Sequence, residues 1–279
     1  MSKSILVLGG TGKTGRRVAE CLINLKHPVR IGSRSGNPKF DWEDPATWAE
    51  ALKDISKVYI SFQPDVAVPG ADAIIREFVH QAKIAGVEKV VLLSGRGEPE
   101  AQECEKVVIA SGLDWTIVKA SWFSQNFSEG IWLDSVLAGH LALPATRVAE
   151  PFVDVDDIAA VAVASLVDDA HSKKIYELTG PRMLTFEQAA KEISEGAHIP
   201  IAYEELTIDQ YTEVLKEYQV SADVIELITY LFTEVLDGRN AYVTNDVENV
   251  LGRKATDFAE YVRKTAATGV WAVRNSVSN

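Results

Sequence analysis

SILVLGGTGKTGRRVA, residues 4–19, is the stretch that decides the fold. An apolar segment, residues 5–9, leads through Gly9, Gly12 and Gly15 into a segment with the apolar spacing of an amphipathic helix. This order predicts a strand, a tight turn and a helix. Such glycines let the backbone approach a phosphate group, and the helix N-terminus offers free N–H donors. The stretch therefore predicts the phosphate turn of a dinucleotide-binding unit, with a purely steric glycine turn as the alternative.

The segment after the second predicted strand, residues 29–33, indicates which dinucleotide is bound. An NAD-binding unit usually carries Asp or Glu near the end of this strand to hold the ribose hydroxyls. Here Ser33, Arg34 and Ser35 stand at that place, and the first carboxylate downstream is Asp41. A cation with two hydroxyls suits a 2′-phosphate, so the sequence favours NADP over NAD. The alternative is that Arg34 is only a solvated loop charge.

Strands and helices alternate over the first 120 residues. Apolar runs predict further strands at residues 58–62, 89–94 and 115–119, while helical spacing predicts helices at residues 71–85 and 100–110. Nearly continuous apolar strands that alternate with helices specify a parallel sheet covered on both faces. We therefore expect an α/β protein with a Rossmann-type, doubly wound parallel sheet. Phe62 and Gln63 end one strand at the ligand edge, although an aromatic residue there is as often part of the core.

The alternation loosens beyond residue 120, where helical patterns dominate. Thr185 and Thr207 each begin the pattern Thr-x-x-Gln, which predicts a capping box at a helix start. Further helices are predicted at residues 130–137, 156–167, 222–236, 246–251 and 257–267, and one more strand at residues 174–178. We expect a Rossmann domain over residues 1–120 and a smaller, mainly helical C-terminal lobe over residues 121–279, with some segments returning to the Rossmann domain.

Composition excludes several classes of partner. Apolar residues make up 47% and charged residues 24% of the 279 residues, as in ordinary globular proteins, and the net charge of −12 disfavours nucleic acid and anionic membranes. Cys21 and Cys104 are far apart, and the histidines are scattered, so neither a disulfide framework nor a metal site is expected. Without a signal peptide or a membrane-length apolar run, we expect a cytoplasmic protein.

Several motifs in order resemble one known family. They are GGTGKTG (9–15), FDWEDPATW (40–48), SGLDWTIVKASWFSQNF (111–127), FVDVDDIA (152–159), YELTGP (176–181) and LGRKATDFAEYV (251–262). Together they resemble the NmrA-like branch of the atypical short-chain dehydrogenases/reductases. Within that branch, the second and third motifs look most like the ergot-alkaloid-type reductases, festuclavine synthase and agroclavine dehydrogenase, and their bacterial relatives.

The resemblance implies an NADP-binding Rossmann fold whose C-terminal lobe forms the substrate pocket. Together with the loop after the second strand, the cofactor contacts that it implies are Gly9, Gly10, Thr11, Gly12, Lys13, Thr14, Gly15, Ser33, Arg34, Ser35, Asp41, Trp42, Phe62, Gln63 and Ser94. The pocket residues that it implies are Trp122, Phe123 and Asn126. For Trp122 and Phe123, packing within the lobe is the alternative.

The chain lacks the catalytic proton donor that is usual in short-chain reductases. Short-chain reductases commonly use Tyr-x-x-x-Lys, but register from residues 111–112 puts Gly97 and Ala101 at those two positions. A protein acid is needed when the reduced product must gain a proton, and it is not needed when a cationic iminium becomes a neutral amine. The missing pair therefore points to an iminium, a quinone-like or another self-sufficient acceptor, or to no catalysis.

Polar and aromatic residues near the predicted strand ends are candidate catalytic groups. They are Tyr59, Ser94, Arg96, Glu98, Lys119 and Trp122, with Ser94, Lys119 and Trp122 retained as catalytic candidates. Lys119 could equally be a lysine that extends from the core edge to solvent. The sequence thus predicts an NADPH-dependent reductase of a small, largely apolar molecule. The alternative is an NADP(H)-binding redox sensor that acts on a protein partner with little or no catalysis.

Overall fold

The computed structural model describes residues 3–145 and 147–272 and divides the chain into two compact units. Unit 1 comprises Met1–Ala120, Val155–Leu178 and Thr244–Lys254. Unit 2 comprises Ser121–Asp154, Thr179–Val243 and Ala255–Asn279. Each unit is therefore built from chain segments that are distant in sequence.

Unit 1 is organised around a six-stranded sheet in which every pairing is parallel. The strands are β1 (Ser4–Leu8), β2 (Val29–Gly32), β3 (Ile55–Ile60), β4 (Lys89–Gly95), β5 (Asp114–Ala120) and β7 (Lys174–Leu178), in the order β2-β1-β3-β4-β5-β7. Because β1 lies between β2 and β3, the strand order reverses beside it, which is where open α/β sheets bind ligands. The expected Rossmann-type fold is confirmed.

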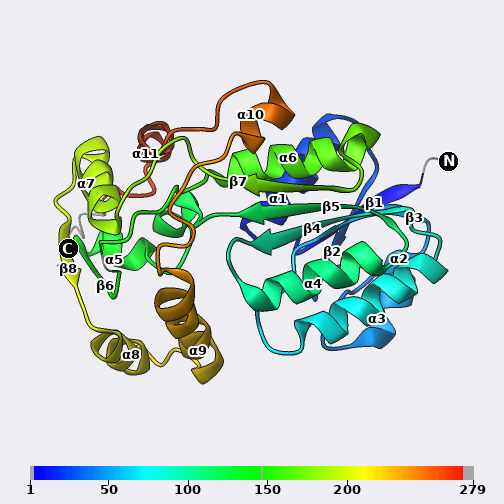
Figure 1. Ribbon diagram of the computed structural model, residues 1–279, viewed down its shortest axis with the longest axis horizontal. Coiled ribbons are helices and arrows are strands. Elements are labelled where there is room, and N and C mark those ends of the chain that lie inside the picture. The colour runs from blue at the N-terminus through cyan, green and yellow to red at the C-terminus, as the bar shows by residue number, and fades with distance from the viewer. Residues whose placement is uncertain (1–2, 146, 273–279) are drawn as a thin grey trace, which may run out of the picture. The chain divides into compact units, whose positions relative to one another are not determined.

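Helices cover both faces of this sheet. They are α1 (Lys13–Asn24), α2 (Trp48–Leu52), α3 (Ala71–Ile84), α4 (Pro99–Ala110), α6 (Val155–Val167) and α10 (Asp246–Leu251), with short 3-10 turns at Pro45–Thr47 and Asp169–His171. Figure 1 shows α3 and α4 along one face of the sheet and α6 along the other, where α1 packs against α6. Two covered faces explain why β1 is apolar after Ser4, with Leu6, Val7 and Leu8 fully buried.

Unit 2 has an aromatic core surrounded by short helices. Its elements are a 3-10 turn at Ser124–Phe127, α5 (Leu133–Leu137), β6 (His140–Leu143), α7 (Phe186–Ala197), β8 (Ala202–Glu205), α8 (Ile208–Glu217), α9 (Ala222–Tyr230), a π-helical turn at Leu231–Val235 and α11 (Phe258–Ala267). Phe127, Trp132 and Phe186 are almost fully buried at its centre. Both predicted capping boxes are present, at Thr185 and Thr207.

The structure adds one element that the sequence pattern did not predict. β6 and β8 form a two-stranded parallel sheet in unit 2, where only helices and loops were expected. These strands have four residues each, β6 reading HLAL and β8 reading AYEE, so the apolar pattern of β6 is too short and that of β8 too polar to identify a strand. The predicted helix at 222–236 also changes character, because α9 ends at Tyr230 and a π-helical turn follows.

Candidate functional site

The parallel sheet of unit 1 brings most of the predicted site residues to one edge. Gly9 follows the end of β1, Ser33 follows β2, and Phe62 lies two residues beyond β3. Ser94 and Lys119 lie near the ends of β4 and β5, where they are paired in register. Since parallel strands end at the same side of a sheet, this carboxyl edge collects the predicted cofactor residues of β1 to β5.

The glycine turn has the shape of a phosphate cradle. Gly9 has a φ of +67°, and a Cβ on Gly15 would lie 2.2 Å from the Gly9 carbonyl oxygen, so both positions require glycine for the turn and the approach of helix to strand. A Cβ on Gly12 would meet no atom closer than 3.2 Å. Packing within the chain thus demands glycine less strongly at Gly12, the position where a phosphate must come close to the backbone.

The N-terminus of α1 is electrostatically suited to an anion. Its first turn contains no acidic residue but includes Lys13 and Arg16, and Gly12 occupies the N-cap without a side chain to satisfy the free N–H groups. Cations at this end of a helix are opposed by the partial positive charge of the helix dipole. A bound phosphate would satisfy the N–H donors and offset both cations.

The loop after β2 carries Arg34, the residue predicted to bind the 2′-phosphate of the cofactor. The Ser33 carbonyl oxygen accepts hydrogen bonds from the N–H groups of Gly36 (3.0 Å) and Phe40 (2.9 Å), which closes the loop on itself. Arg34 and Ser35 are exposed on this closed loop. A guanidinium and a hydroxyl held in this way could donate charge-assisted hydrogen bonds to a phosphate.

An aromatic cluster lies beside this loop. The Trp42 ring is half-buried, with its centroid 4.8 Å from that of Phe62 and 4.9 Å from that of Phe40. The Asp41 carboxylate binds Lys39 at 3.2 Å, and this bond, with a backbone hydrogen bond from Glu43, lowers the pKa of Asp41. Trp42 therefore keeps part of its surface exposed within the aromatic cluster, whereas the Asp41 side chain is held within its own loop.

Two catalytic candidates, Ser94 and Lys119, meet at a third residue, Glu105. The Ser94 hydroxyl donates to Glu105 Oε1 at 2.6 Å, and Lys119 Nζ lies 3.2 Å from Glu105 Oε2. Sequence reasoning missed Glu105, because a glutamate in a helix usually faces solvent. The signal that could have revealed it is its place on the buried stripe of α4 with Ala101, Cys104 and Val108.

The remaining candidates of unit 1, Tyr59, Arg96 and Glu98, are all buried. Tyr59 is fully buried inside β3 rather than beyond its end, and burial raises its pKa. Arg96 is buried and its Nε lies 3.5 Å from Glu177 Oε2, so it serves an ion pair within the unit. Glu98 is buried at the start of α4, a helix whose twelve residues include no tyrosine.

In unit 2, the predicted pocket residues lie next to the aromatic core. The half-buried Trp122 ring stacks on Trp132 with centroids 5.7 Å apart and meets Phe186 edge-on at 5.4 Å. Phe123 and Asn126 are also half-buried. One face of Trp122 thus packs in the lobe, as the alternative for this residue stated, and its remaining exposed surface is compatible with a ligand contact.

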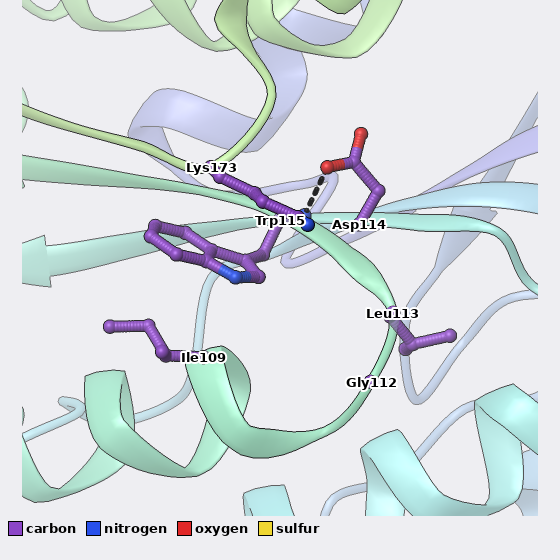
Figure 2. Close-up of a pocket in the computed structure, with 6 residues that line it drawn as sticks. All are labelled: Ile109, Gly112, Leu113, Asp114, Trp115 and Lys173. Atoms are coloured by element: carbon purple, nitrogen blue, oxygen red, sulfur yellow. Dashed lines mark hydrogen bonds between the residues drawn. The ribbon is translucent and has the colours of Figure 1, made fainter.

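A hollow of about 560 Å³ lies at the opposite, amino edge of the sheet (Figure 2). It is lined by Ile109, Gly112, Leu113, Asp114, Trp115 and Lys173, around the first residues of β5. At this start of the strand, the backbone N–H of Trp115 donates to Asp114 Oδ1 at 2.9 Å. None of the predicted site residues lines the hollow, and its edge is the one that Rossmann-type sheets do not use for ligands.

A parallel sheet whose strand order reverses beside a glycine turn and a helix N-terminus defines a Rossmann-type dinucleotide-binding protein. Comparison with known families agrees, since the model of the NAD(P)H-binding family matches residues 9–169. The chain belongs to this NAD(P)H-binding family, and the predicted nicotinamide dinucleotide cofactor is confirmed at that level.

Related proteins extend this result over nearly the whole chain. Agroclavine dehydrogenase of Claviceps fusiformis is 30% identical over 98% of the chain and 100% of that protein, which confirms the predicted likeness to the NmrA-like ergot-alkaloid reductases. Prestalk A differentiation protein A of Dictyostelium discoideum is 25% identical over 94% of the chain and 92% of that protein. The structure of an NADPH-dependent quinone oxidoreductase of Escherichia coli, complexed with NADPH, has the same fold, with a TM-score of 0.78, 22% identity, and coverage of 93% and 99%.

Over residues 3–145 and 147–272, no helix is both long and apolar enough to cross a membrane.

Proposed function

We propose that this protein is an NADPH-dependent reductase that acts on a small, largely apolar acceptor of the iminium or quinone-like class. The observation that carries the proposal is the combination of the glycine turn with the exposed Arg34 loop at one edge of the sheet. Membership of the NAD(P)H-binding family supports the first half of this statement, and Arg34 supports the choice of NADP.

The carboxyl edge of unit 1 fits the cofactor. Gly9, Gly12 and Gly15, with the N–H groups at the start of α1, would hold the pyrophosphate, and Arg34 would hold the 2′-phosphate. Trp42 would contact the adenine. When bound, the cofactor supplies hydride, and the protein's contribution is to position the acceptor and to manage protons.

We infer the acceptor class from the tyrosine that α4 lacks. α4 carries no tyrosine, so the usual phenolic proton donor is not available on this helix. A cationic iminium would need none, and a quinone would need only a modest acid. We assign acceptor contacts to Trp122, Phe123 and Asn126, because half-buried aromatic and amide groups suit a flat, largely apolar molecule.

A second candidate function has its own support. Prestalk A differentiation protein A is named for differentiation and not for a reaction, and it matches the chain over almost its full length. A redox-sensing protein of this fold would bind NADP(H) and report its state to a protein partner. Its distinguishing property would be a large difference between the affinities for NADP and NADPH that changes when the partner is added.

The test is turnover by the purified protein. NADPH oxidation would be followed with a panel of neutral quinones and cationic cyclic iminium compounds, beside NADH as the matched reductant. The reductase proposal expects turnover of at least one acceptor class, with NADPH preferred. Silence over the whole panel, together with tight NADP binding, would contradict it and leave the sensor.

A further inference from the structure

Glu98 is a buried carboxyl group at the same edge of the unit 1 sheet as the cofactor residues. It follows β4 by three residues and is 7% exposed. Its Oε1 atom lies only 1.8 Å from where a Cβ on Gly95 would be, so the carboxyl group folds back over the end of β4. Gly95 therefore provides the space that Glu98 occupies.

The Glu98 side chain does not cap the helix that it precedes. Glu98 is the N-cap residue of α4, yet its side chain makes no capping hydrogen bond. Its Oε2 atom is buried without a hydrogen-bond partner. An ionised carboxylate left in this state would be costly, whereas a protonated one would keep a donor ready for an incoming group.

The groups around Glu98 reinforce the neutral form. Asp65 lies in the segment after β3, while Glu100 and Glu105 lie on α4, and all three act on Glu98 as like charges. Burial is the larger cause, and together these effects raise the pKa of Glu98 to about 8. Asp65 also has a raised pKa because of burial, although N–H groups of Ala67 and Val66 oppose the shift.

Lys119 and Arg96, at the ends of β5 and β4, each have a carboxylate partner. Lys119 Nζ lies 3.2 Å from Glu105 Oε2, and Arg96 Nε lies 3.5 Å from Glu177 Oε2. The Ser94 hydroxyl donates to Glu105 as well. Glu105 thus has an ion-pair partner and a hydrogen-bond donor, whereas Glu98 is the carboxyl group suited to carry a proton.

We propose that Glu98 is the proton donor of this site and stands in for the tyrosine that α4 lacks. The proposal rests on the reductase function and deepens it. With a neutral quinone, the acceptor gains hydride from NADPH and becomes a hydroquinone anion. The O–H bond of the Glu98 carboxyl group then breaks, its proton passes to the anionic oxygen, and the carboxylate regains a proton from water. With a cationic iminium, hydride alone gives the neutral amine.

The first measurement follows the proton itself in the cofactor-free protein. Carbon-13 labelling of the glutamate carboxyl groups, with Glu98→Gln to assign the signal, would give the titration of Glu98 by NMR. A midpoint near pH 8 is expected. A carboxyl group that titrates below about pH 5, as an unperturbed glutamate does, would overturn the proposal whatever the activity.

The second measurement compares two acceptors in matched variants. Glu98→Gln should lower kcat/KM for a neutral quinone about 100-fold and change that for a cyclic iminium by less than about threefold, since general acid catalysis is worth roughly this factor. Glu98→Asp should retain part of the quinone rate. Glu103→Gln is the control, because Glu103 is an exposed residue of α4 that is paired with Lys106 and should leave both rates unchanged.

The outcomes separate the two proposals. Equal losses for both acceptors in Glu98→Gln, or no loss for either, would overturn the role of Glu98 and leave the reductase intact. Wild-type protein that oxidises NADPH with neither acceptor would overturn the reductase function and proton delivery with it. A selective loss with the quinone, joined to a raised midpoint in the NMR titration, would support both.

Discussion

The two edges of the unit 1 sheet both contain buried charge, but they satisfy it in different ways. At the amino edge, Lys89 is 2% exposed and its Nζ has four partners, namely Asp114 Oδ2 at 3.4 Å, Asp169 Oδ1 at 3.7 Å, Ser172 Oγ at 3.3 Å and the Asp168 carbonyl oxygen at 3.3 Å. At the carboxyl edge, Glu98 Oε2 has no partner, and Arg34 is exposed on a closed loop.

The difference indicates which edge is structural and which is available for ligands. A buried ammonium with several oxygen partners has its hydrogen-bonding capacity used within the fold, so it has little left for a ligand. A buried carboxyl oxygen without a partner, at the same sheet edge as the glycine turn and the start of α1, is a group that a ligand can satisfy. The hollow in Figure 2 lies at the amino edge, so the presence of a hollow does not by itself identify the site.

The first expected effect is on stability and lies at the amino edge. Lys89→Ala should lower the free energy of unfolding by about 3 kcal/mol, because a buried side chain is lost together with its packing, hydrogen bonds and ion pairs, while NADP affinity stays within about twofold. Urea unfolding and calorimetry would measure the two quantities. Lys53→Ala, at an exposed lysine 3.7 Å from Glu50, is the control and should cost less than about 0.5 kcal/mol. A large loss of cofactor affinity in Lys89→Ala would contradict the assignment of the amino edge to stability and of the carboxyl edge to ligand binding.

The carboxyl edge should behave in the opposite way. Arg34→Ala should weaken NADP by about 10- to 100-fold, the value of one or two charge-assisted hydrogen bonds, and should leave stability unchanged. NAD affinity should change by less than about twofold, because NAD has no 2′-phosphate. Lys39→Ala serves as control, since that lysine is in the same loop but bound to Asp41. If NADP and NAD weakened alike, Arg34 would not be reading the 2′-phosphate.

A further prediction concerns the pH dependence of stability. Between about pH 4.5 and 8 the folded protein keeps the Glu98 proton while the unfolded chain has lost it, so this proton contributes stability at low pH that disappears as pH rises. Relative to Glu98→Gln, wild-type stability should fall by up to about 1.4 kcal/mol per pH unit in this window and level off above pH 8. Thermal unfolding of both proteins from pH 5 to 9 measures the difference. Parallel curves would mean that Glu98 titrates normally.

The sequence predicted the unit 1 sheet well for a physical reason. Parallel strands covered on both faces are nearly continuous apolar runs, and β1, β4 and β5 each contain such a run, followed by a turn or helix. The glycine turn was equally readable, because a positive φ at Gly9 and the close approach at Gly15 leave few other residue types possible.

Other features could not be read from local patterns. The meeting of Ser94 and Lys119 at Glu105 depends on the register of β4 and β5, which no single segment encodes. The sequence could not distinguish Glu98 from the other candidates, because its burial and the absence of a capping hydrogen bond from its side chain are visible only in the structure. The short strand β8 is polar and edge-like, so its pairing with β6 is a tertiary effect.

Amide hydrogen exchange with and without NADP tests the central claim, that the carboxyl edge of the unit 1 sheet binds the cofactor, most directly. The account predicts added protection in residues 9–16 and 33–36 and none in residues 109–115, which line the hollow at the amino edge. Protection confined to residues 109–115, or no protection in the glycine turn at saturating NADP, would contradict it.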